Sequence, residues 1–253
     1  MLRSLFMLMI YLSFLGIGTA APFVFTLGYI WVDTFRPQDV AYIILNQFPV
    51  AMVMGAAAVG GYLLMDRRHA PRMNGIWLLQ ILMGIWVTVT LIWAVSPDAA
   101  WVKWDWASKT VLFSAFVPLV IRSKVQIEAV VQTYLFSLAA NIIPFGVKTV
   151  LSGGGYGRNL GLVGGNAGLG EGGLLSTACL MVIPLALHLA RHTELLPKWR
   201  LTSLGYWGLA GLALVTAVGT FQRSALIGLI AMVLFLVARS RHKLVWGFVG
   251  FVV

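Results

Sequence analysis

The chain has 253 residues, of which 60% are hydrophobic and only 10% are charged. Soluble domains carry about 45–50% apolar and about 25% charged residues, so this composition excludes a soluble enzyme and excludes intrinsic disorder. A single cysteine, Cys179, excludes a disulfide framework and a cysteine-rich metal site. In so apolar a chain, the net charge of +10 indicates loops that face anionic lipid rather than nucleic-acid binding.

Eight apolar runs follow one another along the chain, and each is a candidate membrane-spanning helix. They cover residues 5–31, 48–65, 75–95, 109–121, 126–150, 173–190, 203–219 and 223–238. A ninth run begins at Val245 and is still apolar at Val253, so we expect the sequence to be an incomplete protein. The predicted fold class is an all-α, polytopic integral membrane protein with eight transmembrane helices and the start of a ninth.

Two of these runs have unusual lengths. The first, 5–31, is interrupted by small residues and by Pro22, and we expect one long helix that is kinked or tilted. The alternatives are a cleaved signal peptide and a pair of short helices, and the pair would invert the charge bias of every later loop. The fourth run, 109–121, is short for a span, so it is either extended by residues 104–108 or sits tilted in a thinned bilayer.

Lysine and arginine are divided unevenly between alternate loops. If the N-terminus is cytoplasmic and each run crosses once, twelve of these residues lie on the cytoplasmic side and six on the opposite side. The twelve are Arg3, Arg67, Arg68, Arg72, Arg122, Lys124, Arg191, Lys198, Arg200, Arg239, Arg241 and Lys243. The six are Arg36, Lys103, Lys109, Lys148, Arg158 and Arg223. Because cytoplasmic loops are enriched in lysine and arginine, this ratio predicts a cytoplasmic N-terminus.

Arg223 stands between the last two complete runs, in the stretch Gly219–Leu226, which leaves almost no room for a loop. The stretch predicts a tight helical hairpin with Thr220 as the N-cap of the second helix, which puts Arg223 in the first turn. The helix dipole is positive there and no carboxylate is near in sequence, so free N–H groups and a guanidinium form a candidate phosphate site. Gln222 and Ser224 are candidate supporting residues. The alternative is an arginine that extends to the membrane surface.

A glycine-rich loop precedes this region, with eleven glycines among residues 152–173. Glycine lets backbone N–H groups approach a ligand closely. Arg158 is a candidate ligand-binding residue, and Asn166 and Glu171 are candidate supporting residues. The alternative is a mobile linker between two spans.

Tryptophan is concentrated before the fourth run, where Trp101, Trp104 and Trp106 surround Lys103 and Asp105. Indole rings can stack on a sugar ring while the charges bond its hydroxyl groups, so Trp104 and Trp106 are candidate sugar contacts. Tryptophan is also the usual residue of a bilayer interface, and this alternative stays open.

No metal site and no cofactor site are predicted. The only two histidines at helical spacing are His188 and His192. We expect this pair to lie at the membrane interface, because no carboxylate between them completes a metal-binding motif.

The residues around Arg223 resemble the central motif of the O-antigen ligase and polymerase superfamily, in which an Arg-Ser or Arg-Gly pair opens a helix after a short turn. Here the motif reads Thr220-Phe221-Gln222-Arg223-Ser224-Ala225-Leu226. The preceding glycine-rich loop and a helix containing Pro184 also fit. The N-terminal half, with its long first run and its Arg36-Pro37 turn, is similar to putative O-glycosylation ligases found beside exosortase systems.

This resemblance implies a metal-independent glycosyltransferase of the bacterial inner membrane, with a periplasmic active face and no cofactor. It would transfer a glycan from an undecaprenyl-diphosphate carrier to an acceptor lipid, protein or glycan. The implied partners are lipid-linked oligosaccharide or polysaccharide and membrane lipid, not nucleic acid. Arg223 matches the arginine that holds the carrier diphosphate in that family, and Arg158 is a second candidate for this role.

The family places its acceptor-activating histidine in a large outer loop after about the ninth span, so we expect that residue beyond Val253. We therefore assign no catalytic residue, and we expect the fragment to be inactive alone. The sequence divides into membrane helices (1–150), a glycine-rich outer loop (151–172) and an incomplete ligase-like region (173–253). Two other functions stay open: a transporter or flippase of a lipid-linked or anionic solute, and a non-catalytic scaffold of envelope assembly.

Overall fold

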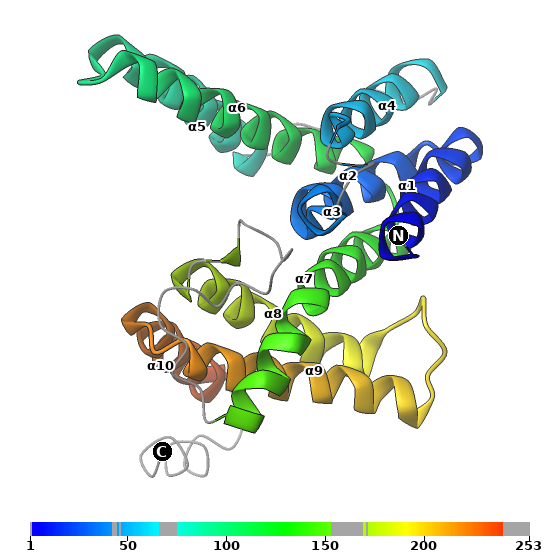
Figure 1. The fold of residues 1–253 in the computed structure, drawn as a ribbon, viewed down its shortest axis with the longest axis vertical. Coiled ribbons are helices and arrows are strands. Elements are labelled where there is room, and N and C mark those ends of the chain that lie inside the picture. The colour runs from blue at the N-terminus through cyan, green and yellow to red at the C-terminus, as the bar shows by residue number, and fades with distance from the viewer. Residues whose placement is uncertain are drawn as a thin grey trace. The chain divides into compact units, whose positions relative to one another are not determined.

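The computed structural model describes residues 2–41, 45, 47–65, 75–152, 169–170 and 172–239, and every regular element within these ranges is a helix. The first half of the chain forms α1 (Leu2–Ala20), α2 (Phe23–Phe35), α3 (Pro37–Val40), α4 (Val50–Met65), α5 (Gly75–Val89), the 3-10 helix η1 (Thr90–Trp93) and α6 (Pro97–Val120). The second half forms α7 (Lys124–Ser152), α8 (Gly172–His192), α9 (Arg200–Gly219) and α10 (Arg223–Arg239) (Figure 1). The predicted all-α class is confirmed, whereas the ninth run lies outside the described residues.

Five helices of the described part are long and apolar enough to cross a membrane. They are α1, α5 together with η1, α7, α8 and α9. Three shorter apolar helices, α2, α4 and residues 223–235 of α10, do not reach that length. The chain is therefore a membrane-embedded helical protein, and the predicted number of eight spans stays a prediction.

The first apolar run forms two helices, so the expected single kinked helix is wrong. Ala21 N closes α1 by donating to Ile17 O at 3.0 Å, and Val24 N opens α2 by donating to Ala21 O at 2.8 Å. Pro22 stands at the break, where its missing N–H and rigid ring prevent α1 from continuing. A Cβ added at Gly28 would lie 2.9 Å from Phe14 Cβ, so the two helices fold back on each other as an antiparallel hairpin.

The fourth run belongs to a helix that begins well before it. α6 starts with Pro97 in its first turn, directly after Ser96, a common helix-start pattern. The helix carries Asp98, Lys103, Asp105 and Lys109 within its first thirteen residues, so an apolar window marks only the part that follows. Extension of the run through Trp104 was among the sequence-based expectations, and the structure extends the helix further, to Pro97.

The chain divides into two compact units that do not follow chain order. Unit 1 holds Met1–Leu8, Ile30–Phe48 and Glu128–Val253, and unit 2 holds Met9–Tyr29 and Pro49–Ile127. In unit 2, α5 packs against α6: Trp77 Nε1 donates to Ala115 O at 3.0 Å, and a Cβ at Gly84 would lie 3.1 Å from Val111. The three-part division of the sequence stays a prediction.

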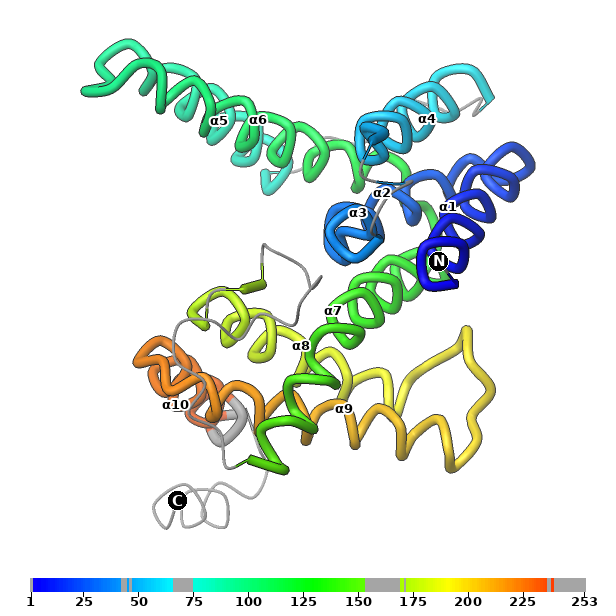
Figure 2. Tube along the Cα trace, viewed as in Figure 1, coloured from blue at the N-terminus to red at the C-terminus, as the bar shows by residue number. Residues whose placement is uncertain are grey.

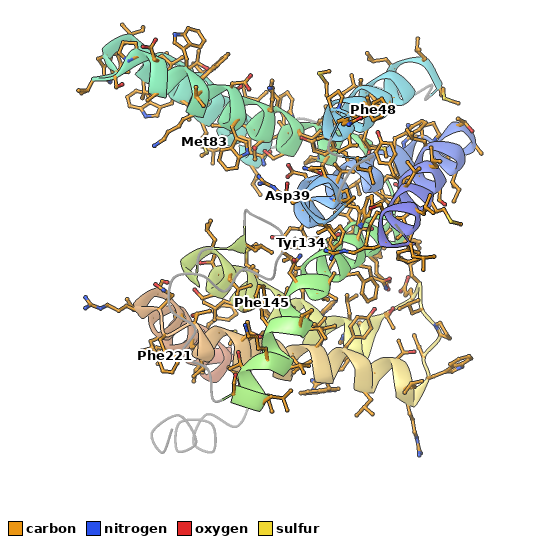
Figure 3. All side chains as sticks on the ribbon, in the orientation of Figure 1. Asp39, Phe48, Met83, Tyr134, Phe145 and Phe221 are labelled. Carbon is orange, nitrogen blue, oxygen red and sulfur yellow. The ribbon has the colours of Figure 1, made fainter. Side chains whose placement is uncertain are left out.

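In unit 1, α8 and α9 form an antiparallel pair, and α7 packs across it (Figure 2). The core that they share consists of side chains at helical spacing: Leu135, Leu138, Ala139, Ile142 and Phe145 of α7, Leu175, Ala178, Cys179, Val182, Ile183, Ala186 and Leu189 of α8, and Tyr206, Leu209, Ala210, Ala213 and Ala217 of α9. Small residues let α9 approach α7 closely, since a Cβ at Gly146 of α7 would lie 3.1 Å from Leu212 O of α9. Phe145 points into this core, whereas Phe221 is exposed (Figure 3).

The Arg36-Pro37 turn lies between α2 and α3 in unit 1. Arg36 adopts the left-handed conformation (φ 55°), and Pro37 is the first residue of α3. The guanidinium forms an ion pair with Asp39 at 3.9 Å, so this turn is the salt-bridged arrangement that its sequence favours.

We predict that cysteines at positions 14 and 28 form a disulfide under mild oxidation in a Cys179→Ala background. The hairpin brings the two positions into contact, whereas a continuous helix would hold them about 21 Å apart, far beyond disulfide reach. Mass spectrometry of the proteolysed protein gives the yield of the cross-linked peptide.

Cysteines at positions 16 and 28 form the matched control. A Cβ at Gly16 meets nothing within 4 Å, so this pair should not cross-link. Equal yields for both pairs, or none for either, would contradict the hairpin.

Candidate functional site

The turn between α9 and α10 is only a few residues long and brings Arg223 to the start of a helix. The Thr220 hydroxyl donates to Ala217 O at 2.7 Å, so it is bonded to the end of α9 and not to α10. The expectation that Thr220 caps α10 is therefore wrong, because Phe221 and Gln222 separate it from that helix. Gln222 takes the position before the first turn, and its carbonyl accepts from Ala225 N at 3.1 Å.

Phe221 reverses the chain inside this turn. Its φ of 50° lies in the left-handed region, which costs a non-glycine residue roughly 1–2 kcal/mol. Its N–H donates to Val218 O at 3.1 Å, which completes the end of α9. A strained residue directly before Gln222 and Arg223 is a reason to examine the turn for function, since such strain persists only where the surroundings hold it.

Three segments meet at this end of unit 1, and we call this place the junction: the last turns of α7 (149–152), the first turn of α8 (172–175) and the turn 219–224. A Cβ at Gly172 would lie 2.9 Å from Gln222 Nε2, so the Gln222 side chain rests on the start of α8. A Cβ at Gly219 would lie 3.0 Å from Thr149 Oγ1, which places the end of α9 against α7. The described residues that flank the glycine-rich loop, in α7 and α8, therefore both lie at the junction.

Arg223 is exposed at the first position of α10, and Ser224 beside it is exposed as well. Within the described ranges, no carboxylate forms an ion pair with Arg223 and no hydrogen bond engages its guanidinium. The first N–H groups of a helix have no partners within that helix, and they attract negative charge. The junction thus presents a cation and a helix start together, an arrangement that suits an anion such as phosphate.

Three predicted site residues cannot be placed. Arg158 and Asn166 belong to residues 153–168, and Glu171 directly precedes α8. All three lie outside the residues that the structure describes. Gln222 and Ser224, by contrast, lie beside Arg223 as the sequence requires.

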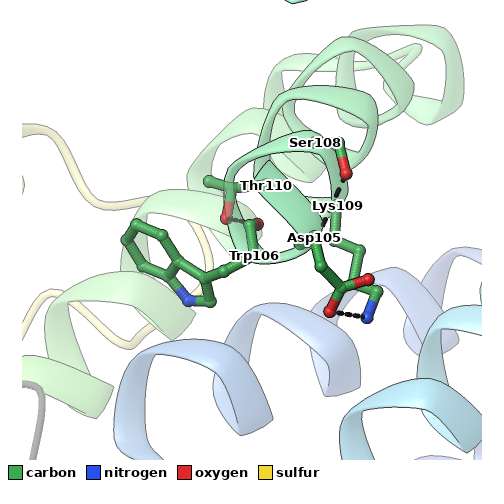
Figure 4. A network of polar contacts seen from close by, with 5 residues as sticks. All are labelled: Asp105, Trp106, Ser108, Lys109 and Thr110. Atoms are coloured by element: carbon green, nitrogen blue, oxygen red, sulfur yellow. Dashed lines mark hydrogen bonds and ion pairs between the residues drawn. The ribbon is translucent and has the colours of Figure 1, made fainter. Parts of the chain in front are cut away.

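Trp104 and Trp106 lie on α6, in unit 2, whereas Arg223 belongs to unit 1. The Trp104 Nε1 group donates to Thr88 Oγ1 at 3.1 Å, and the Trp104 ring meets Trp101 edge-on with centroids 5.1 Å apart. Trp106 remains 63% exposed beside the Lys109–Asp105 ion pair of 2.6 Å (Figure 4). Of the two candidate sugar contacts, Trp104 is thus engaged in packing α5 on α6, whereas Trp106 has an exposed indole ring.

A groove of about 530 Å³ runs between α5 and α6. Its walls are Trp77, Ile81, Gly84, Ile85, Thr88, Val89, Trp104, Ser108, Val111, Leu112, Ala115, Phe116 and Leu119. Thr88 and Ser108 are the polar side chains in this lining besides the two indole N–H groups. Both of those N–H groups are already hydrogen-bonded, so the groove offers an apolar chain more than it offers a sugar.

The opposite end of unit 1 contains a carboxylate that sequence reasoning missed. Glu128, near the start of α7, accepts from Thr193 Oγ1 at 2.6 Å, from Glu194 N at 2.9 Å and from Leu195 N at 3.1 Å. Gln132 Nε2 donates to the same carboxylate at 2.8 Å. Glu128 thereby ties α7 to the residues that follow α8, an arrangement that we call the Glu128 clasp. An acidic residue in so apolar a helix was the available signal, but nothing in the sequence identified its partners.

His188 and His192 stack on α8 with ring centroids 4.8 Å apart. Their rings are one helical turn apart, and His192 Nδ1 lies 3.2 Å from His188 O. No group of three or more possible metal ligands occurs in the described part of the chain.

The helices and their apolar surfaces define this protein as a polytopic α-helical membrane protein. The chain belongs to a family of unknown function, DUF5935, whose sequence model matches residues 2–194. No curated protein and no solved structure matches the chain. The matched residues run from α1 to just beyond the end of α8 and include Glu128, Gln132, Thr193 and Glu194 of the clasp, whereas Leu195, Arg223 and α10 follow them.

We predict that Glu128→Gln lowers the stability of unit 1, because an amide cannot accept all the donors that the carboxylate now satisfies. These hydrogen bonds are exposed or part-buried, and a typical hydrogen bond contributes about 0.5–1.5 kcal/mol net. Thermal unfolding of the purified protein in detergent measures the loss, and trypsin should cut faster after Lys198 and Arg200, which follow the clasp.

Glu194→Gln is the matched control, since the Glu194 side chain is exposed and forms no ion pair among the described residues. Its unfolding temperature and cleavage rate should equal those of the wild type. Equal effects of the two substitutions would contradict a specific role of Glu128.

Proposed function

We propose that this protein is a glycosyltransferase of the bacterial inner membrane, similar to the O-antigen ligases. It would transfer a glycan from an undecaprenyl-diphosphate carrier to an acceptor lipid, protein or glycan on the periplasmic side. The observation that carries this proposal is the exposed Arg223 at the start of α10, which lacks a carboxylate partner in the described part of the chain. Its position at the junction, next to the start of α8, supports the same role.

The reaction assigned to this site is a displacement at the anomeric carbon of the glycan. A hydroxyl oxygen of the acceptor forms a bond to that carbon, the bond to the carrier diphosphate breaks, and the hydroxyl proton leaves to a base. Negative charge therefore grows on the departing diphosphate. A cation fixed where that charge develops lowers the barrier, and Arg223 supplies such a cation.

Neighbouring residues would support the diphosphate. The Ser224 hydroxyl and the first N–H groups of α10 can donate hydrogen bonds to phosphate oxygens, and Arg158 would add a second guanidinium from the glycine-rich loop. Gln222 rests on Gly172, so its role would be to hold the turn against α8. The carrier is already activated, so the transfer requires no nucleotide.

The orientation in this proposal rests on the loops that follow α4. Sides cannot be assigned by counting one crossing for each apolar run from the N-terminus, because the first run forms the α1–α2 hairpin and not one crossing helix. If α5 to α10 each cross once, eleven lysines and arginines beyond residue 65 fall on one side: Arg67, Arg68, Arg72, Arg122, Lys124, Arg191, Lys198, Arg200, Arg239, Arg241 and Lys243. Five fall on the other: Lys103, Lys109, Lys148, Arg158 and Arg223. The enrichment of cytoplasmic loops in such residues then puts Arg223 on the periplasmic face.

We predict that Arg223→Ala reduces glycan transfer about a hundredfold or more, because the leaving diphosphate loses its fixed cation. Arg223→Lys should also be impaired, since an ammonium cannot form the two parallel hydrogen bonds of a guanidinium. The measurement is the amount of the affected surface glycan in a gene-deletion strain complemented with each full-length variant.

Lys124→Ala is the matched control, because Lys124 is an exposed cation at the start of α7, away from the junction. It should restore the glycan fully, and immunoblots of membranes must show equal amounts of all variants. Wild-type transfer by Arg223→Ala would remove the proposal. Accumulation of an untransported lipid-linked precursor inside the cell would favour a flippase instead.

We also predict the sides of three surface positions. Single cysteines replacing Val102 and Ser152 should react with a membrane-impermeant maleimide in intact cells whose outer membrane is permeabilised, whereas one replacing Glu194 should react only after lysis. All three residues are exposed in the structure, and Cys179→Ala removes the native thiol. Labelling of position 194 alone in intact cells would reverse the orientation.

A further inference from the structure

The connection between α8 and α9 carries three exposed cations. Arg191 lies in the last turn of α8, Lys198 precedes α9, and Arg200 is the first residue of α9. We call residues 191–200 the basic connection. It lies at the opposite end of the α8–α9 pair from the turn that leads to α10, and therefore away from the junction (Figure 2).

None of these three cations is paired with a carboxylate among the described residues. Glu128 is near the basic connection, but its oxygens accept from the Thr193 hydroxyl and from backbone N–H groups. These hydrogen bonds fix the backbone at residues 193–195, and Glu128 forms no ion pair with the three cations. Glu194 is exposed and engages none of the cations. The basic connection, with three cations and Glu194, therefore carries a net positive charge.

Aromatic and apolar side chains stand among the cations. Trp199, which is 68% exposed, lies in sequence between Lys198 and Arg200. The Arg191 guanidinium carbon lies 5.8 Å from the centre of the Trp207 ring, a cation–π contact. Leu195 and Leu201 are exposed as well. Charged side chains that alternate with indole rings and leucines suit a boundary between water and hydrocarbon.

The two helices that flank the basic connection fix its depth. α8 and α9 are both long and apolar enough to cross the membrane, so the short connection between them lies at a bilayer surface. We propose that the basic connection is a binding surface for the headgroups of anionic phospholipids. The phosphate and glycerol oxygens of the headgroups accept from Arg191, Lys198 and Arg200, while Trp199 inserts at the level of the glycerol backbone.

A lipid fits these residues better than a soluble polyanion does. Nucleic acid would bind the cations equally well, but it would leave Trp199, Leu195 and Leu201 in water beside it. A bilayer satisfies both sets of side chains at once. This surface is independent of the proposed transfer activity, because no residue of the junction takes part in it.

The experiment uses native mass spectrometry of the full chain released from nanodiscs that contain equal amounts of phosphatidylglycerol and phosphatidylcholine. Wild-type protein should retain phosphatidylglycerol preferentially. Each neutralised cation should weaken that preference about fivefold, since a lysine or arginine near an anionic surface contributes about that factor. The variant Arg191→Gln/Lys198→Gln/Arg200→Gln should therefore lose the preference.

Two controls separate the charge from the fold. The variant Arg191→Lys/Lys198→Arg/Arg200→Lys keeps every charge and should keep the preference. The variant Arg3→Gln/Lys103→Gln removes cations elsewhere and should also keep it. The proposal is overturned if wild-type protein retains both lipids equally, if the triple glutamine variant keeps its preference, or if a soluble oligonucleotide displaces phosphatidylglycerol at equal phosphate concentration.

Discussion

The antiparallel packing of α8 against α9 is the constraint on which the rest of unit 1 depends. Alanines along both helices, among them Ala178, Ala186 and Ala213, let the two backbones approach, and α7 crosses them where Gly146 meets Leu212. Without a hydrophobic driving force between helices in lipid, such close packing is the main source of association. Because the pair is rigid, its register fixes both of its ends, and these ends carry the two candidate binding surfaces.

The polar groups at the two ends of the α8–α9 pair are hydrogen-bonded in different ways. At the junction, the Thr220 hydroxyl and the Phe221 N–H complete the end of α9 without the Arg223 side chain. At the other end, Glu128 satisfies the backbone after α8, so Arg191, Lys198 and Arg200 remain without a carboxylate among the described residues. The chain has only eight acidic residues for eighteen lysines and arginines. Exposed cations without a carboxylate partner can bind anions from outside the protein, and phosphate groups are the anions that a bilayer offers.

Most of the helices follow from apolar length alone. The runs that end near Met65, His192 and Gly219 become α4, α8 and α9, because a window of apolar residues in a membrane protein has few options besides a helix. Apolar length alone also led to the wrong expectation of a single helix for the first run. Its residues are apolar on both sides of Pro22, so composition could not show that α2 folds back on α1, which depends on the contact of Gly28 with Phe14.

The errors at smaller scale have three origins: local bonds of equal quality, charged residues within a helix, and contacts between residues far apart in sequence. Thr220 is a good N-cap residue by type, but its hydroxyl finds Ala217 O before it can reach α10. The start of α6 at Pro97 was concealed by charged residues that reduce its apolar character, although Ser96 and Pro97 signal a helix start. The role of Glu128 could not be predicted, because all of its partners except Gln132 lie more than sixty residues away.

The residues that match the family model include α8 but not Arg223. Residues 2–194 contain α8 and all of the Glu128 clasp except Leu195, so the helix whose start lies at the junction belongs to the matched part of the chain. Arg223 lies on α10, which follows this part and packs along α8, and Gln222 beside it contacts Gly172 at the start of α8. A Cβ at Gly172 would meet the end of the Gln222 side chain, 2.9 Å from Nε2, and that flexible side chain can move aside. The placement of Arg223 therefore depends on the packing of α10 along α8, where a Cβ at Gly228 would meet Leu180, and not on Gly172 alone.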